Sequence, residues 1–231
     1  IFVLGGAVKG TLGVGLPLVV VPMLSLLIAG PRAMGLLVAP VLLSNLWQAW
    51  ESGKLGKVRR FVPLIVTQLV VTLLTVKFSQ GMSADLFNTL LALVVISAVL
   101  LMAFRPRGEI SPRHERWAGP LVGAIAGFMG GVSSLTGPIL ITYLVALRLG
   151  RDEFVGSISI LYLISAVPMY AAMLWWGRFG WEEVGWSFVA LVPMFIGLKL
   201  GTAVRHRLSE ELFRRLLFGF LTLLSVLLLV K

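Results

Sequence analysis

The hydrophobic pattern of this chain consists of long apolar blocks separated by short polar connections. Eight blocks cover residues 2–28, 33–50, 61–78, 86–104, 118–147, 154–176, 184–204 and 212–230. About 20 helical residues cross a hydrocarbon core of roughly 30 Å, so the blocks have the length of membrane segments. They lack the alternating pattern of a membrane barrel strand. The pattern therefore predicts an all-α polytopic membrane protein with eight hydrophobic segments.

The composition agrees with this class. Hydrophobic residues make up 58% of the 231 residues and charged residues 13%, whereas charged residues make up about 25% of soluble domains. The net charge of +10 would suggest nucleic acid as the partner of a soluble protein. Here the basic residues flank apolar blocks, where Lys and Arg set the orientation in the membrane. We therefore expect a lipid bilayer around the protein and no nucleic acid partner.

The two halves of the chain resemble each other. Residues 6–13, GAVKGTLG, align with residues 123–130, GAIAGFMG, and SADLF at 83–87 matches SEELF at 209–213. The second pair places a serine cap and acidic residues at the start of a helix in each half. The chain thus divides into a first membrane repeat at 1–104, a cytoplasmic linker at 105–117 and a second membrane repeat at 118–231.

The basic residues in the connections indicate how the halves are oriented. If all eight blocks cross the membrane, the two sides receive nine and eight of these residues, which gives no bias. If the fifth block enters and leaves on one side, fourteen share a side and only Arg32, Lys77 and Arg178 lie opposite. Cytoplasmic loops carry the excess of Lys and Arg, so the fourteen are expected in the cytoplasm, as in an oriented inner-membrane protein.

The same tally favours inverted repeats. Because the first block resembles the fifth, it is also expected to be a re-entrant hairpin. The charge tally concerns only the fifth block, so a first block that crosses the membrane remains an alternative. Each half then contains a hairpin and three spans, an odd number, so the halves have opposite orientations. Inverted repeats with broken helices at their interface are a common plan of secondary transporters.

Helix-breaking residues lie in the first block of each half. Residues 5–22 read GGAVKGTLGVGLPLVVVP, and the apolar arms on either side of the break are too short to span alone. Turns are therefore expected between Gly13 and Pro17 and within residues 130–138. Pro17 and Pro138 are expected to open the second arms. The N-terminus of each arm carries unpaired N–H groups and a positive dipole end, which favours an anion.

The two turns are expected to meet and form a substrate site, because irregular backbone at membrane depth must face protein or a water-filled cavity. The candidates in these turns are Lys9, Thr11, Gly13, Val14, Gly15, Gly131, Ser133, Ser134 and Thr136. A charge within a membrane segment is costly and marks a functional candidate. Lys9 could instead extend its amine to the membrane interface, since it lies near the start of the chain.

Polar residues in two further blocks are also candidates. Asn45 and Gln48 share a helix face in the second block, and the matching stretch of the sixth block contains Tyr162 and Ser165. We include Asn45, Gln48 and Ser165 in the site, although such groups also form hydrogen bonds between helices. The GxxxG spacings at 6–10 and 123–127 can likewise serve only close helix packing.

Other chemistries find little support in the sequence. There is no Walker lysine loop, no intramembrane carboxylate pair and no His-acid cluster for a metal. Cysteine is absent, which excludes thiolate metal sites and a thiol nucleophile. We therefore expect no enzyme activity, no catalytic residues, no metal and no cofactor.

Two glycine-rich motifs carry a resemblance to a known family. They are Gly6-x-x-x-Gly10-x-x-Gly13-x-Gly15 followed by Val21-Pro22, and Gly123-x-x-x-Gly127-x-x-Gly130-Gly131 followed by Gly137-Pro138. With the eight blocks and this length, the chain resembles the sulfite exporter TauE/SafE family, also called the toluene sulfonate uptake permeases. The resemblance covers essentially the whole chain and implies transport of sulfur-containing anions across the bacterial inner membrane.

From these features we expect a secondary transporter of sulfite or organosulfonates that works by alternating access, with the anion held at the N-termini of the hairpin arms. The alternatives are a passive anion channel and, from another class, a membrane scaffold or enzyme. The sequence leaves open the exact anion, the direction of transport, the coupling ion and whether the protein is a homodimer.

Overall fold

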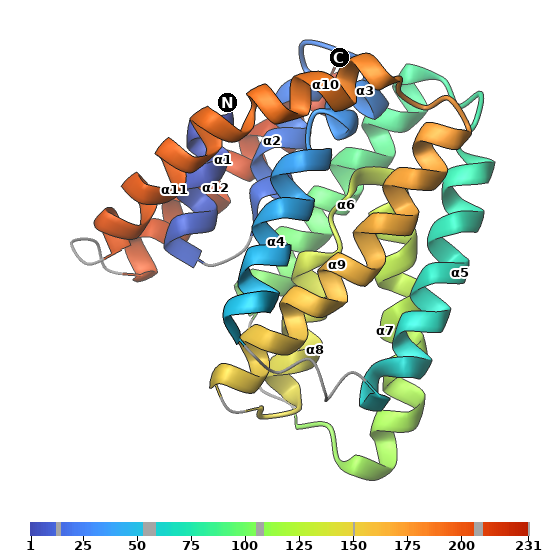
Figure 1. Ribbon diagram of the computed structural model, residues 1–231, viewed down its shortest axis with the longest axis vertical. Helices are drawn as coiled ribbons and strands as arrows, with labels where there is room; N and C mark the ends of the chain where they lie inside the picture. The colour runs from blue at the N-terminus through green and yellow to red at the C-terminus, as the bar shows by residue number, and fades with distance from the viewer. Residues whose placement is uncertain (13–14, 53–58, 105–108, 150, 206–209, 231) are drawn as a thin grey trace.

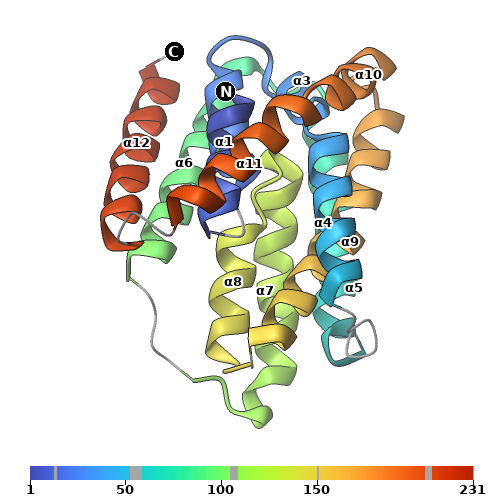
Figure 2. The same cartoon turned by 60° about the vertical axis from the view of Figure 1, so that its left-hand side comes forward.

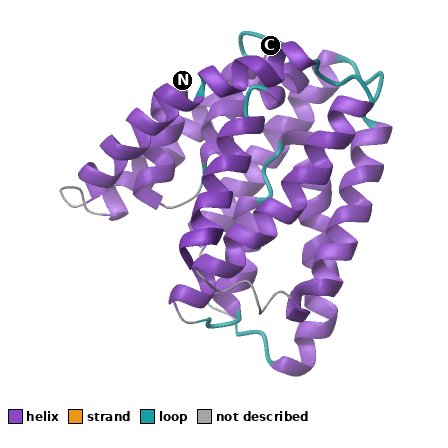
Figure 3. Ribbon diagram, viewed as in Figure 1, coloured by secondary structure: helices purple, strands orange, loops and turns teal. Residues whose placement is uncertain are grey.

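The computed structural model consists of helices joined by short loops over the residues that it describes, which are 1–12, 15–52, 59–104, 109–149, 151–205 and 210–230 (Figure 3). The helices are α1 (Phe2–Leu12), α2 (Leu16–Ser25), α3 (Gly30–Gly35), α4 (Val38–Ser52), α5 (Val62–Phe78), α6 (Ala84–Phe104), α7 (Pro112–Ser133), α8 (Gly137–Ala146), α9 (Arg151–Trp175), α10 (Trp181–Val189), α11 (Leu191–Arg205) and α12 (Glu210–Val230). No strand occurs in these ranges. The predicted all-α class is confirmed.

Each predicted block falls on one helix or on two successive helices. Four segments are long and apolar enough to cross a membrane, at 30–50, 59–78, 84–101 and 156–175. The pair α10 and α11 adds a fifth if its bend of 42° lies within one span. The chain is therefore a multi-pass membrane protein, while the full count of eight segments stays a prediction.

Two helix starts lie near the predicted boundaries, and the division of the chain into two repeats and a linker stays a prediction. Helix α7 begins at Pro112, inside the stretch 105–117 that the sequence assigns to a linker. Proline is favourable at the first helical position, where its missing N–H costs nothing. At the start of α6, the expected serine cap is present, because Ser83 Oγ accepts the N–H of Leu86 at 3.3 Å. The matching Ser209 lies outside the described residues.

The two faces of α5 have the polarity expected of a helix in lipid. Val66, Val70 and Leu74 lie one helical turn apart and are about half exposed. The opposite face, which is buried, includes Gln68 and Thr72. An apolar face toward the outside and a polar face toward the protein are the reverse of a soluble helix. The exposed apolar face therefore fits contact with lipid.

Helices of the first half pack along helices of the second half. The pairs are α1 with α11, α5 with α7, α4 with α9, and α6 with α12. Glycines allow the first two pairs to approach closely. A Cβ on Gly10 would lie 2.2 Å from the carbonyl oxygen of Leu198, and a Cβ on Gly123 would lie 2.4 Å from that of Leu64. The GxxxG motifs thus bring helix backbones into contact, which is the packing role considered above.

Two helical hairpins open toward opposite ends of the molecule. The hairpin of α1 and α2 opens toward the end where the N-terminus lies, and that of α7 and α8 opens toward the other end (Figures 1 and 2). Helix α1 ends at Leu12 and α7 ends at Ser133, so both predicted breaks are present. The second arms, α2 and α8, have 10 residues each, about 15 Å of helix. The hairpin tips therefore lie in the interior of the molecule.

The main hydrophobic core surrounds α2. It joins side chains of α2, α6, α9 and α12, among them Val20, Leu91, Met173 and Leu221, all of which are buried. Helix α2 is thus enclosed by protein although it is too short to span a membrane.

Candidate functional site

Both hairpin tips depend on residues that suit a sharp turn. Gly15 precedes α2 with a φ of 103°, in the left-handed region that glycine adopts without a steric penalty. Ser134 follows α7 with a φ of 61°, and its N–H donates to the carbonyl oxygen of Gly130 at 2.8 Å. Pro17 and Pro138 are each the second residue of the following helix, as expected. Neither N-cap residue, Gly15 of α2 or Thr136 of α8, caps its helix through a side-chain hydrogen bond.

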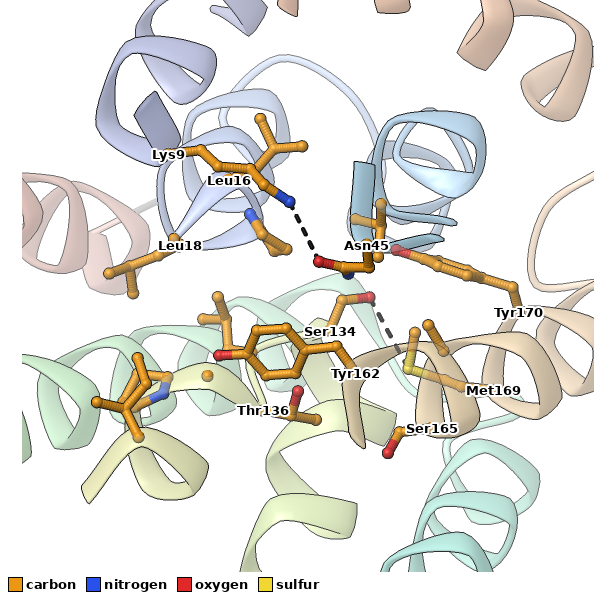
Figure 4. Close-up of a pocket in the computed structure, with 18 of the residues that line it drawn as sticks. Lys9, Leu16, Leu18, Asn45, Ser134, Thr136, Tyr162, Ser165, Met169 and Tyr170 are labelled. Carbon is orange, nitrogen blue, oxygen red and sulfur yellow. Dashed lines mark hydrogen bonds between the residues drawn. The ribbon is translucent and has the colours of Figure 1, made fainter. Parts of the chain in front are cut away.

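A cavity of about 60 Å³ lies between the two tips (Figure 4). One water molecule needs only about 10–15 Å³ by this measure, so the cavity has room for a small polyatomic ion. Residues 15–18 and 134–138 form its two ends. Its polar side chains are Lys9, Asn45, Thr72, Ser134, Thr136, Tyr162, Ser165 and Tyr170.

Lys9 is the one basic residue among the described residues that line the cavity. Its side chain is 5% exposed, and Nζ donates to Ser44 Oγ at 2.6 Å and to Asn45 Oδ1 at 3.2 Å. Both acceptors belong to α4, so the amine lies inside the protein rather than at its surface. Among the described residues no carboxylate pairs with it. An ammonium group has three N–H donors, so a third acceptor can come from a ligand.

Two buried tyrosine hydroxyls lie beside the cavity without a partner at hydrogen-bond distance in the described part of the chain. They belong to Tyr162 and Tyr170 on α9, and that of Tyr170 lies near enough to Ser134 to interact with it. A Cβ on Gly137 would lie 2.7 Å from the Tyr162 hydroxyl, which places that hydroxyl at the first turn of α8. Figure 4 shows both rings among the cavity side chains. A buried hydroxyl without a partner costs free energy, and an oxygen of a bound ligand would remove that cost.

Asn45 supplies a further donor. Its Oδ1 atom accepts the hydrogen bond from Lys9, which leaves the Nδ2 group available as a donor. The side chain is 4% exposed and lies on the cavity wall. Lys9, Asn45 and the two tyrosines therefore surround one small volume with N–H and O–H groups. The chemistry of the cavity suits an acceptor-rich ligand, which is the character of an oxyanion.

The cavity brings together six of the residues predicted as a site. They are Lys9, Gly15, Asn45, Ser134, Thr136 and Ser165. The Ser165 hydroxyl donates to the carbonyl oxygen of Leu161 at 2.5 Å, within its own helix. Ser134 Oγ makes a long contact of 4.0 Å with Met169 Sδ. Ser134 also interacts with Tyr170, so its hydroxyl lies beside the tyrosines rather than on its own backbone.

Four other predicted residues lie away from the cavity wall. Thr11, Gln48, Gly131 and Ser133 do not line the cavity, and Gly13 and Val14 lie outside the described residues. Thr11 Oγ1 donates to carbonyl oxygens of Ala7 at 2.8 Å and Gly201 at 3.1 Å, which ties α1 to α11.

Two of these residues support the second tip. Ser133 Oγ donates to the carbonyl oxygen of Met129 at 2.7 Å and accepts the N–H of Leu135 at 3.3 Å. Gly131 packs against α5, where an added Cβ would lie 2.7 Å from Thr75 Cβ. Both residues thus hold the tip in shape from behind the cavity.

A family comparison covers both hairpins and the cavity between them. The family model described as Sulfite exporter TauE/SafE matches residues 1–228 of the 231. The chain belongs to the sulfite exporter TauE/SafE family. This confirms the resemblance carried by the glycine motifs and makes the chain a membrane transporter of the sulfite exporter type. The comparisons with curated proteins and with solved structures found no match.

Three polar lining residues of this TauE/SafE protein lie outside the predicted set of site residues. They are Thr72 on α5 and Tyr162 and Tyr170 on α9. The signal in the sequence is a set of polar residues inside an apolar segment. Tyr162 and Ser165 are three residues apart on one face of α9, and Met169 follows four residues later on the same face. In the sequence, Tyr162 stands out only because its stretch of the sixth block matches the polar stretch around Asn45 in the second block. Tyrosine is common at membrane interfaces, so this signal alone does not separate a ligand from an interfacial residue.

Proposed function

We propose that this chain is a secondary transporter that carries small sulfur-containing anions, such as sulfite or organosulfonates, by alternating access. The anion would lie between the two hairpin tips. The observation that carries the proposal is the convergence of buried donors on one cavity, namely Lys9, Asn45 Nδ2 and the hydroxyls of Tyr162 and Tyr170. A cation would find mainly donors and few free acceptors there.

The helix termini at the cavity add to this preference. The first residues of both α2 and α8 line it, and neither helix has a side-chain cap. The positive dipole end of a helix stabilises an anion by about 0.3–1 kcal/mol at exposed sites and more where water is excluded. Two such ends beside a lysine favour an anion over a neutral solute of the same size.

The packing of equivalent glycines supports two inverted repeats, at 1–104 and 118–231. A Cβ on Gly6 would lie 2.2 Å from the Met194 carbonyl oxygen, much as one on Gly123 would lie 2.4 Å from that of Leu64. One turn later, Gly10 meets Leu198 and Gly127 meets Gln68 in the same way, at 2.2 and 2.6 Å. Each half therefore packs its first helix into the other half. With hairpins that open to opposite ends, this is the arrangement of inverted-repeat transporters.

Ion pairs join the halves at both ends of the molecule. Arg32 Nε lies 2.5 Å from Glu183 Oε1, between α3 and α10. Arg60 Nε lies 2.5 Å from Glu115 Oε1, where α5 begins beside α7. Helices α3 and α10 lie at one end of the molecule, and the first turns of α5 and α7 lie at the other end (Figures 1 and 2). Rocking of one half against the other would separate one pair while the other stays closed.

Transport by the purified protein in liposomes tests the proposal. We expect saturable uptake of ³⁵S-sulfite that accumulates against its own gradient when a suitable ion gradient is imposed. Lys9→Met should reduce the uptake at least tenfold, because a hydrogen bond to a charged group contributes about 1.5–3 kcal/mol. Lys199→Met is the matched control, since Lys199 is exposed on α11, and it should transport like the wild type.

Two results would contradict the proposal. Undiminished uptake by Lys9→Met, with the protein intact by size-exclusion chromatography, would remove the anion from this cavity. Flux that never exceeds the electrochemical equilibrium of sulfite would indicate a passive channel instead of a secondary transporter.

A further inference from the structure

The surroundings of Lys9 match a neutral amine better than an ammonium group when the cavity is empty. A neutral amine has two N–H groups, and two acceptors are present, Ser44 Oγ and Asn45 Oδ1. Ser44 Oγ itself donates to the carbonyl oxygen of Pro40 at 2.5 Å, so its lone pairs are free to accept. A third N–H on the nitrogen would have no acceptor among the described residues.

The other elements around Lys9 bring no acid to balance its charge. Helix α4 contributes Ser44 and Asn45, and the titratable groups that α9 places on the cavity are Tyr162 and Tyr170. Residues 15–18 at the start of α2 carry no charge. Helix α11 packs glycines against α1, and its Lys199 is exposed. Among the described residues, the cavity contains no carboxylate and no histidine.

This environment makes the charge on Lys9 depend on the ligand. A buried charge without a partner is unfavourable, because it has lost its hydration. A bound oxyanion supplies both the missing counter-charge and the third acceptor. The ammonium form is therefore favoured while the anion is bound, and the neutral amine is favoured after it leaves.

Building on the proposed function, we propose that Lys9 is the proton carrier of the transport cycle. The amine takes a proton from water on the side to which the cavity is open, as the anion binds. After the halves rearrange, the anion leaves and the amine gives the proton to water on the other side. One proton thus crosses with each anion, and the empty protein returns with a neutral Lys9.

The Lys9→Arg variant separates this role from anion binding. Arginine stays protonated in proteins, so it keeps the positive charge but cannot release the proton. Exchange of external for internal sulfite does not require the empty protein to return, whereas net uptake does. We expect Lys9→Arg to retain ³⁵S-sulfite exchange within about threefold of the wild type, because its charge still matches the anion. Its net uptake should fall at least tenfold and lose its response to a pH gradient.

Two further measurements complete the test. In wild-type liposomes an alkaline interior should accelerate net sulfite uptake and leave sulfite exchange unchanged. Lys9→Met, which carries no charge, should lose both activities. Size-exclusion chromatography and the thermal unfolding midpoint establish that each variant is folded. If Lys9→Arg does not fold, the effect of the pH gradient on net uptake by the wild type still tests the proposal.

The outcomes distinguish this inference from the proposed function. Wild-type net uptake that ignores the pH gradient overturns the proton-carrier role, as does wild-type net uptake in Lys9→Arg. The same follows if Lys9→Arg and Lys9→Met behave identically in both assays. Absence of any sulfite transport by the wild type would instead overturn the proposed function.

Discussion

At the scale of single residues, the cavity contains two buried tyrosine hydroxyls without a partner at hydrogen-bond distance. Most buried polar groups in proteins have a hydrogen-bond partner, and many hydroxyls here follow this rule by donating to a carbonyl oxygen one turn back, as Thr142 and Ser225 do. The hydroxyls of Tyr162 and Tyr170 cannot reach their own backbone, because the ring holds them several ångströms away. Their partners must come from outside the helix, and a ligand in the cavity is in reach.

The tyrosine hydroxyls lead to a prediction in which binding and stability change in opposite directions. Tyr162→Phe and Tyr170→Phe should each raise the KM for sulfite about tenfold, the effect of losing one hydrogen bond to a charged group. The thermal unfolding midpoint without sulfite should stay the same or rise, since a buried hydroxyl without a partner is removed. Uptake kinetics and thermal unfolding of the purified variants measure the two effects.

Tyr143→Phe is the control for this experiment. Tyr143 lies on α8 in a separate hydrophobic cluster, beside Phe61, and does not line the cavity. Its KM should equal that of the wild type. An unchanged KM in both Tyr162→Phe and Tyr170→Phe would show that the anion does not use these hydroxyls.

At the scale of elements, glycines decide how closely α1 approaches α11 and α5 approaches α7. Carbonyl oxygens of one helix occupy the space where a Cβ of the other would stand, at Gly6, Gly10, Gly197 and Gly201 for the first pair. Small residues at helix interfaces permit such contacts in membranes, where water does not drive helices together. The first helix of each hairpin is therefore fixed by a partner helix from the other half.

Alanine substitution should reveal this role at Gly201. A Cβ there would lie 2.1 Å from the Ala7 carbonyl oxygen. Overpacking of this kind costs about 1–3 kcal/mol or more, so Gly201→Ala should lower the thermal unfolding midpoint. Gly219→Ala on α12 is the matched control, because nothing lies within 4 Å of its Cβ position. It should leave the midpoint unchanged or raise it, and equal midpoints for the two variants would contradict the interpretation.

At the scale of the whole molecule, the described basic residues are distributed unequally between the two ends. Arg60, Arg113 and Arg116 lie where α5 and α7 begin, at the end toward which the second hairpin opens. Arg32 and Arg178 lie near α3 and α10 at the opposite end. Several members of the larger basic group, among them residues 54, 57, 105 and 107, lie outside the described residues. The tally from the sequence thus remains the argument for a cytoplasmic location of this group.

Cysteine labelling tests the orientation directly, since the chain contains no cysteine. Ser111→Cys and Gln80→Cys place single thiols at exposed positions beside α7 and between α5 and α6. A membrane-impermeant maleimide should label Gln80→Cys in intact spheroplasts and Ser111→Cys only after the membrane is opened. The reverse pattern would invert the proposed topology, and labelling of both from one side would contradict it.

Much of the fold could be predicted because its causes are local. Blocks of apolar residues form helices in a membrane to satisfy their own backbone, so the all-α class followed from the pattern. Gly15, Pro17 and Pro138 act on the backbone at their own positions, and both hairpin breaks occur where these residues lie. The glycine motifs also placed the chain in its family.

Tertiary structure alone decided which polar side chains face the cavity. Lys9 meets Ser44 and Asn45 across 35 and 36 residues of chain, and Thr11 meets Gly201 across 190. The sequence by itself determined that the two broken segments contain polar groups, but whether a hydroxyl braces a helix or faces a ligand depends on distances between helices. Those distances follow from close backbone contact at glycines and from packing between the halves. This is why Thr11 and Ser133 support the tips while Tyr162 and Tyr170 line the cavity.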